Sequence, residues 1–172
     1  FGKYTDMIDA FKILKVNEVD AIAMGAKSIF KINDGLPFVA ISAGTGTACI
    51  YNDNGVTTHL GGISVGGGTL QGLSKKLLNE DSSATLEKLS LAGNRTNLDS
   101  LIGEVVNDIG SLHPEITASN FEKAKYSDDH SNSDIAASLS NMVGEIIGTI
   151  SYLNALLMGV SEVFFIGRVA NL

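Results

Sequence analysis

The fold of this chain is decided by the stretch Phe38-Val-Ala-Ile-Ser-Ala-Gly-Thr-Gly-Thr-Ala-Cys-Ile-Tyr-Asn-Asp-Asn-Gly-Val-Thr-Thr-His-Leu60. It contains three runs of apolar and β-branched residues (38–42, 48–51 and 56–60), and such runs between turn residues are typical of strands. The Asn54-Gly55 pair separates the second run from the third and is a strong signal for a two-residue hairpin turn. Because the Gly44–Thr47 segment is short enough for a tight link, we predict an antiparallel meander of three strands.

Helical patterns lie on both sides of this meander, with apolar residues recurring every three or four positions. They cover residues 5–16, 18–30, 69–78, 84–91, 97–109 and 134–158. We expect the helix over 97–109 to begin at Asn97, with Asp99 in its first turn. The short apolar run Val163–Ile166 predicts a further, buried strand. Together these patterns predict an α/β fold in which helices flank a mixed sheet.

The composition excludes several classes of protein. Of the 172 residues, 44% are hydrophobic and 18% are charged, which is too apolar for intrinsic disorder. The net charge is −7 and the only adjacent basic pair is Lys75-Lys76, so we expect no nucleic-acid partner. No apolar run reaches the length of a membrane span and no signal peptide is visible, so we expect a cytoplasmic protein without a membrane partner. One cysteine and three scattered histidines give no pattern for a zinc site.

Glycines cluster on both sides of the predicted hairpin, with nine of the nineteen lying between Gly44 and Gly72. The three glycines Gly66–Gly68 precede a helical pattern, and backbone N–H groups at a helix N-terminus favour bound anions. The Gly44–Thr47 turn adds hydroxyl groups that could donate to phosphate oxygens. Neither segment matches a P-loop or a dinucleotide-binding motif. The alternative is that these glycines only permit a bend and a close crossing of two strands.

The order of these segments resembles type II pantothenate kinases, the eukaryotic and staphylococcal-like branch. The resemblance rests first on a G-T-G-T-A turn between strands and on Gly61-Gly-Ile-Ser-Val-Gly-Gly-Gly-Thr-Leu-Gln-Gly-Leu73. Four further blocks follow the family's order: Glu18-Val-Asp-Ala21, Ala92-Gly-Asn-Arg-Thr-Asn-Leu-Asp99, Thr117-Ala-Ser-Asn-Phe121 and Val163-Phe-Phe-Ile-Gly167.

The resemblance implies a ribonuclease-H-like fold of the actin, hexokinase and Hsp70 ATPase superfamily. Residues 1–34 would be the end of the first lobe with its linking helices, and residues 35–172 a ribonuclease-H-like ATPase lobe, incomplete at its C-terminus. The family's D-x-G-G-T phosphate segment has no counterpart here, so this chain alone should be inactive. The resemblance also implies a homodimer formed through long helices. The helix over 134–158 supports a dimer, because it has two apolar stripes: one of Leu139, Met142, Ile146, Ile150 and Leu153, and a second of Ile135, Val143, Ile147 and Leu157.

The implied activity is ATP-dependent phosphorylation of pantothenate, the first step of coenzyme A biosynthesis, with Mg²⁺ on the phosphates and acyl-CoA as a possible feedback ligand. Glu18 would be the catalytic base, and Thr45 and His59 would contact the substrate. No side chain of this chain is assigned as a metal ligand. The nucleotide-binding residues would be Gly44, Thr45, Gly46, Thr47, Gly67, Gly68, Thr69, Leu70, Gln71 and Arg168.

Two positions depart from the family pattern on the substrate side. Ala48 stands where members commonly carry Ser, and His59 stands where they carry Arg. Arg makes a fixed, always-charged contact with a carboxylate, which His cannot reproduce. Two alternatives therefore remain: a kinase of another small hydroxylated substrate, and a non-catalytic module that senses a nucleotide or an acyl-CoA. Glu18 and His59 could also be ordinary surface residues, and Cys49 is expected to be a small core residue.

Overall fold

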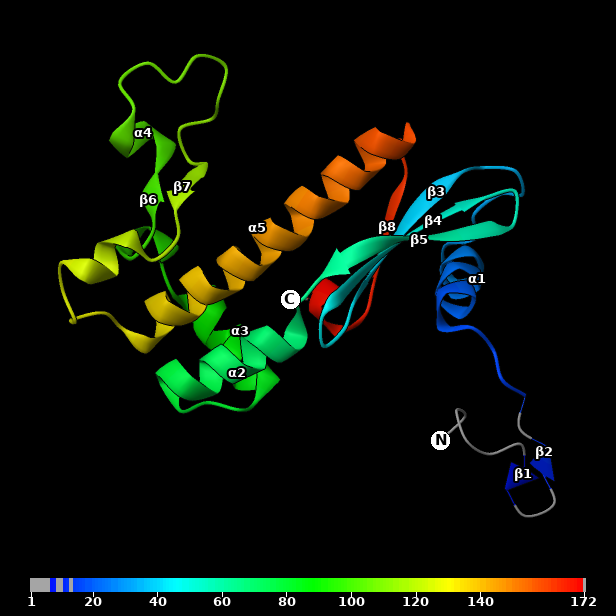
Figure 1. The fold of residues 1–172 in the computed structure, drawn as a ribbon. Helices are drawn as coiled ribbons and strands as arrows, with labels where there is room; N and C mark the ends of the chain where they lie inside the picture. The colour runs from blue at the N-terminus through cyan, green and yellow to red at the C-terminus, as the bar shows by residue number, and fades with distance from the viewer. Residues whose placement is uncertain (1–6, 9–10, 13, 172) are drawn as a thin grey trace. The chain divides into compact units, whose positions relative to one another are not determined.

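The computed structural model describes residues 7–8, 11–12 and 14–171, and it consists of two compact units (Figure 1). The first unit comprises the described residues up to Ser42, together with Ala48–Gly62 and Ser151–Ile166. The second comprises Ala43–Thr47, Ile63–Ile150 and the described residues from Gly167 onward. The chain passes between the units several times, so neither unit is one continuous segment.

A four-stranded sheet with the order β5-β4-β3-β8 forms most of the first unit. Its strands are β3 (Phe38–Ala43), β4 (Thr47–Asp53), β5 (Val56–Ile63) and β8 (Val163–Ile166). Short links join β3 to β4 and β4 to β5, which only antiparallel neighbours allow. Strand β8 instead pairs with β3 in parallel, with Val39 opposite Val163. The predicted meander and mixed sheet are therefore confirmed.

The turn between β4 and β5 has the conformation that its sequence predicts. Asn54 and Gly55 have φ angles of 50° and 82°. Two consecutive positive φ angles define the type I′ turn, whose twist matches that of the flanking strands. Cys49, on β4, is 1% exposed and is a core residue as expected, and burial raises the pKa of its thiol.

Helix α1 (Glu18–Phe30) packs on this sheet and has the predicted bounds (Figure 1). It begins after Asn17, whose side chain accepts a hydrogen bond from the N–H of Val19 (2.9 Å), as an N-cap residue should. The ring of Phe164 on β8 lies 5.0 Å from that of Phe30 and 5.7 Å from that of Phe38. These contacts belong to a core cluster that also contains Ile22, Ala26, Ile32 and Ala40.

Two predictions for the first unit are wrong. The described part of residues 5–16 contains two short antiparallel strands, β1 (Met7–Ile8) and β2 (Phe11–Lys12), and residues 14–17 are not helical. In such a short window, apolar residues fit the helical and the strand period about equally well. The remaining residues of 5–16 lie outside the described part of the chain. Strand β8 is half-buried rather than buried, with Phe165 41% exposed, because it is the edge strand of the described sheet.

The second unit is mainly helical. Its elements are α2 (Gly67–Leu78), α3 (Ser83–Ala92), η1 (Arg95–Asn97), β6 (Ser100–Leu101), α4 (Ile102–Val105), β7 (Thr117–Ser119), η2 (Glu122–Lys125), η3 (Arg168–Asn171) and most of α5 (Asn132–Met158). Buried leucines from α2, α3 and α5 (Leu70, Leu86 and Leu139) belong to its core. The helices predicted over 69–78, 84–91 and 134–158 are confirmed to within a few residues.

The helix predicted over 97–109 does not form. Asp99 is fully buried, and its carboxylate accepts hydrogen bonds from the N–H of Phe121 (2.9 Å) and the hydroxyl of Ser138. The N–H of Ile102 donates to Ile116 O (2.8 Å), which pairs this segment with β7 instead of with itself. These long-range contacts outweigh the local helical pattern, and only the four-residue helix α4 remains.

Helix α5 is the longest described element, and it ends where its sequence predicts. Gly159 has a φ angle of 66°, and the N–H of Val160 donates to Ala155 O (3.0 Å). A left-handed glycine with such a bond is the usual end of an α-helix. Neither α5 nor any other described helix combines the length and apolarity needed to span a bilayer.

Candidate functional site

The two glycine segments lie against each other in the second unit. The N–H of Gly67 donates to Gly44 O (2.7 Å), and the N–H of Gly68 donates to Thr45 O (3.0 Å). The link between β3 and β4 is thereby fixed to the first turn of α2. Because these two N–H groups bond within the protein, other groups must supply most of the contacts to a ligand.

Only glycine fits at this crossing. A Cβ added to Gly66 would lie 2.8 Å from the backbone of Gly46, and one added to Gly67 would lie 2.9 Å from Gly44 O. At Gly68 the added Cβ would lie 2.8 Å from Cγ2 of Thr45. Such distances are shorter than real carbon contacts, so the alternative of a close backbone crossing holds. It does not exclude a binding site, because a cavity opens beside the crossing.

Two threonine hydroxyls that we expected to bind nucleotide instead hold the crossing together. The buried Thr47 donates from Oγ1 to Val65 O (2.8 Å). Thr69 donates from Oγ1 to Ser64 O (3.1 Å) and accepts from the N–H of Gly66 (3.3 Å). Thr47, Thr69 and Gly46 therefore shape the loops without lining the cavity.

A cavity of about 590 Å³ lies beside the crossed loops, a volume typical of small-molecule sites. Seven of the predicted nucleotide-binding residues line it: Gly44, Thr45, Gly67, Gly68, Leu70, Gln71 and Arg168. Sequence reasoning missed four others: Ser83, Leu86, Gly167 and Val169.

Of the missed residues, Gly167 could have been predicted from the sequence, whereas Ser83 and Leu86 could not. Gly167 ends the block Val163–Gly167 and has a φ angle of 103°, and a Cβ there would lie 2.3 Å from Ala43 O. A glycine directly after a strand is a recognisable signal for such a close approach. Ser83 and Leu86 carry no signal of this kind, because they reach the cavity only through the packing of α3.

The charge distribution of the cavity favours an anion. No carboxylate is among the described residues that line it, whereas Arg168 is exposed and its guanidinium forms no ion pair with any described residue. The N-terminal turns of α2 and α3 contribute Gly67, Gly68 and Ser83, and helix N-termini carry partial positive charge. The hydroxyl of Thr45 likewise has no partner in the described part of the chain. The cavity can therefore take a ligand that carries phosphate groups.

The predicted base Glu18 and the predicted substrate residue His59 lie in the first unit and do not line this cavity, whereas Thr45, the other predicted substrate residue, does. Glu18 is the first residue of α1 and is exposed, so the burial expected of a catalytic base is absent in this chain. His59 is exposed on β5, as an ordinary surface residue would be, and Ala48 is half-buried on β4. Among the described residues, no three His, Cys, Asp or Glu side chains are grouped as a metal site would require.

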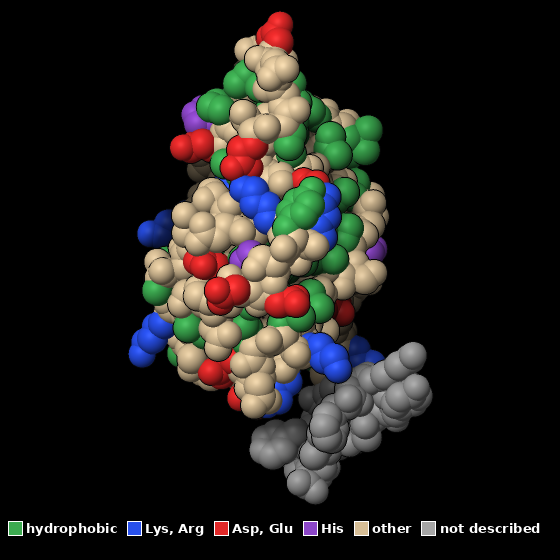
Figure 2. All heavy atoms as spheres, turned by 90° about the vertical axis from the view of Figure 1, so that its left-hand side faces the viewer, with side chains coloured by type: hydrophobic (Ala, Val, Ile, Leu, Met, Phe, Trp, Pro, Cys, Tyr) green, Lys and Arg blue, Asp and Glu red, His purple; other side chains and the backbone are tan. Residues whose placement is uncertain are grey.

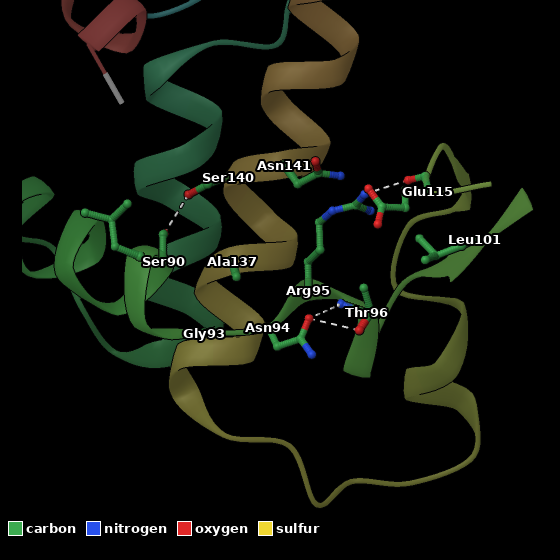
Figure 3. Close-up of a pocket in the computed structure, with 11 residues that line it drawn as sticks. Ser90, Gly93, Asn94, Arg95, Thr96, Leu101, Glu115, Ala137, Ser140 and Asn141 are labelled. Atoms are coloured by element: carbon green, nitrogen blue, oxygen red, sulfur yellow. Dashed lines mark hydrogen bonds between the residues drawn. The ribbon is translucent and has the colours of Figure 1, made fainter. Parts of the chain in front are cut away.

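A second cavity, of about 570 Å³, contains none of the predicted site residues (Figure 3). It lies between the end of α3, η1 and α5, and its polar groups bond mostly to one another. Arg95 donates to Glu115 O (2.8 Å) and Thr117 Oγ1 (2.7 Å), and the Ser90 and Ser140 hydroxyls are 2.8 Å apart. These bonds join η1 to Glu115 and β7, and α3 to α5, which is a structural role.

The surface gives no sign of a nucleic-acid site on the face shown in Figure 2. Lys and Arg side chains of the described residues lie there among Asp and Glu side chains and do not form a continuous basic area.

The fold and the site thus define a mixed α/β protein with a glycine-lined, anion-favouring cavity. The sequence profile described as Fumble matches residues 7–171, nearly the whole chain. The chain therefore belongs to the Fumble family.

Individual proteins with similar sequences are named type II pantothenate kinases. The chain is 37% identical over 168 residues to a protein of Bacillus cereus strain AH820 named type II pantothenate kinase. Proteins of the same name from Bacillus anthracis and Oceanobacillus iheyensis are 36% and 30% identical. These matches cover 92–93% of this chain but only 59–61% of each relative. The chain thus spans about three fifths of the length of these relatives, and the resemblance to type II pantothenate kinases is confirmed.

Proposed function

We propose that the full-length protein transfers the γ-phosphate of ATP to pantothenate and so forms 4′-phosphopantothenate, the first step of coenzyme A biosynthesis. The observation that carries this proposal is the anion-favouring cavity at the crossed glycine loops, in a chain of the Fumble family. Because the chain spans about three fifths of its relatives, the rest of the protein would complete the site. The chain by itself is expected to be inactive.

The phosphates of ATP would lie at the glycine end of the cavity. The free hydroxyl of Thr45 and the guanidinium of Arg168 would donate to phosphate oxygens there, and the N-terminal turns of α2 and α3 would add favourable charge. Gly44, Gly46, Thr47, Gly67, Gly68 and Thr69 would act by shaping the loops. With no carboxylate in the cavity lining that the structure describes, Mg²⁺ would be held by the phosphates of the nucleotide and not by this chain.

Glu18 would accept the proton of the pantothenate hydroxyl as that oxygen attacks the γ-phosphorus. Phosphoryl transfer needs little covalent chemistry from the protein, so positioning and charge neutralisation would supply most of the rate. Thr45 would contact both phosphate and substrate, and His59 would contact pantothenate. Substrate and the remainder of the protein would have to bury Glu18, which is exposed in this chain.

The family membership also supports a ribonuclease-H-like fold of the actin type, of which the β5-β4-β3-β8 sheet would be the centre. We assign residues 35–172 to this ATPase lobe and residues 1–34 to the end of the first lobe. The protein would act in the cytoplasm, with acyl-CoA as a feedback ligand.

ADP formation by the full-length protein, measured with and without pantothenate, tests the proposal. We expect pantothenate to stimulate turnover, and Glu18→Gln to abolish it while ATP affinity stays within a few-fold, because an amide cannot accept the proton. Asp20→Asn, on the same first turn of α1, is the matched control and should keep most of the activity. Turnover that pantothenate does not stimulate, or that survives in Glu18→Gln, would contradict the proposal.

His59 favours a second candidate, a kinase for another small hydroxylated acceptor. An imidazole is shorter than a guanidinium and cannot form its bidentate contact, so it would bind the pantothenate carboxylate more weakly than the Arg of the family pattern. If pantothenate is the acceptor, His59→Arg should lower its KM by roughly tenfold, since a charge-assisted hydrogen bond contributes about 1–3 kcal/mol. An unchanged or raised KM in a folded variant, with turnover on another acceptor, would favour the second candidate.

A further inference from the structure

Side chains of α2 and α3 form the part of the glycine-lined cavity that lies beyond the glycines. Leu70 and Leu86 are each only 3% exposed, so they give this part a rigid apolar wall. Gln71 and Ser83 add two exposed polar groups to the lining. An apolar wall with a few polar groups suits a planar base, whose faces are apolar and whose edge carries donors and acceptors.

The amide of Gln71 is oriented by Ser83. Nε2 of Gln71, on the second turn of α2, donates to Oγ of Ser83, the first residue of α3 (3.4 Å). Neither side chain forms another hydrogen bond with the described residues. A side-chain amide has one donor end and one acceptor end. Because the amide nitrogen carries two N–H groups and one of them is used on Ser83, the oxygen Oε1 and the second N–H remain for a ligand.

An acceptor beside a donor distinguishes bases by the groups at their edge. Adenine carries an exocyclic amine that donates a hydrogen bond, whereas hypoxanthine and guanine carry a carbonyl oxygen at the same position, and glutamine is a common partner of adenine. Two acceptors facing each other leave both without a hydrogen bond, which is unfavourable.

From this geometry we infer that Gln71, oriented by Ser83, is a specificity-determining residue that selects an adenine nucleotide, whose base carries an amine where hypoxanthine and guanine carry a carbonyl oxygen. The inference rests on the proposed function, because it requires that the cavity binds a nucleotide. It assigns a role to Ser83, and it explains why the lining of the cavity includes α3.

Calorimetric titration of the full-length protein with ATP and with ITP tests this inference. ITP differs from ATP at the edge of the base, where a carbonyl replaces the amine. We expect the wild type to bind ATP about tenfold more tightly than ITP. Gln71→Leu should weaken ATP binding and bring the two affinities within about threefold. Ser83→Ala should also bring the two affinities within about threefold, but by improving ITP binding, because the released amide can turn its donor end to the ligand.

The matched control is Thr85→Ala, which removes a hydroxyl from α3 outside the cavity lining and should keep the wild-type preference. Circular dichroism melting would show that each variant is folded. Equal affinity of the wild type for ATP and ITP, a preference for ITP, or an unchanged preference in both cavity variants would overturn this inference alone. Failure of the wild type to bind either nucleotide would overturn the proposed function and this inference with it.

Discussion

Helix α2 contains one glycine that the packing requires and one that it does not. A Cβ at Gly67 would lie 2.9 Å from Gly44 O and 3.0 Å from Cγ2 of Val169, whereas a Cβ at Gly72 would meet nothing within 4 Å. The first position is the contact between the loops, and the second lies five residues further along the same helix. The same substitution should therefore have opposite effects at the two positions.

We expect Gly67→Ala to lower the free energy of unfolding by about 1–3 kcal/mol, because it overpacks the crossing. Gly72→Ala should raise it by up to about 1 kcal/mol, because alanine is the better helix former. Urea denaturation of the two variants measures both effects. Similar stability of Gly67→Ala and Gly72→Ala would mean that the crossing is not tightly packed.

Sequence motifs predicted which glycines form the cavity better than they predicted which side chains line it. Gly44, Gly67 and Gly68 were predictable because a glycine cluster between apolar runs marks a close backbone approach. Thr47 and Thr69 were predicted to bind nucleotide, but their hydroxyls bond to Val65 O and Ser64 O, and sequence does not reveal where a hydroxyl points. Ser83 was missed because only the packing of α3 brings it to the cavity.

At the element scale, Asp134 links the first turn of α5 to the segment that follows α3. Its carboxylate accepts from the N–H of Asn94 (2.7 Å) and from Nδ2 of Asn97 (3.0 Å). These hydrogen bonds, with the backbone N–H of Asn94 the largest cause, lower the pKa of Asp134 from its ordinary value. The ionised carboxylate therefore stabilises the folded state.

The sign of this shift predicts how stability depends on pH. A carboxylate whose pKa is lowered by folding stabilises the protein at pH values above its pKa in the unfolded state, about 3.9. This contribution is lost as the pH falls through the pKa of the folded state. We expect Asp134→Asn to cost about 1 kcal/mol at pH 7, since the carboxylate is only half-buried. The difference from wild type should shrink below about pH 4.

Thermal unfolding of wild type and Asp134→Asn between pH 3 and pH 7 measures this dependence. Asp129→Asn, an exposed carboxylate in the loop before α5, is the matched control and should follow the wild type. A constant difference between Asp134→Asn and wild type across this range would show that the charge of Asp134 does not contribute.

The elements that sequence predicted correctly are those whose local signals agree with their packing. Helix α1 has an N-cap at Asn17 and a buried apolar face, and the turn between β4 and β5 has the Asn54-Gly55 pair. The helix predicted over 97–109 failed because the burial of Asp99 and its bonds to Phe121 and Ser138 outweigh a local pattern. Contacts between residues this far apart in the sequence leave no periodic pattern from which they could be predicted.

At the scale of the whole molecule, α5 has more apolar surface than its neighbours in the described chain cover. Leu139, Val143 and Ile147 form its buried face, a different grouping from the two stripes that the sequence suggested. Near its end, Tyr152, Leu153, Leu156 and Leu157 are all more than half exposed. Exposed apolar patches of this kind often mark protein–protein contacts, and a two-fold contact would pair the same patch on two copies.

We therefore expect the full-length protein to be a homodimer, as the resemblance implies. Size-exclusion chromatography with light scattering at micromolar concentration should give twice the mass of one chain. Leu157→Asp should shift the mass toward the monomer, whereas Thr149→Asp, which places the same charge at another exposed position of α5, should not. A monomeric wild type would show that the rest of the protein covers these side chains.

Hydrogen exchange of the full-length protein with and without ATP would show whether the cavity at the crossed glycine loops binds ATP. We expect ATP to slow exchange in peptides covering residues 66–72 and 167–169, which contain residues that line that cavity. Peptides covering residues 93–97, at the second cavity, should exchange at an unchanged rate and serve as the internal control. Unchanged exchange at 66–72, or protection confined to 93–97, would contradict ATP binding in that cavity.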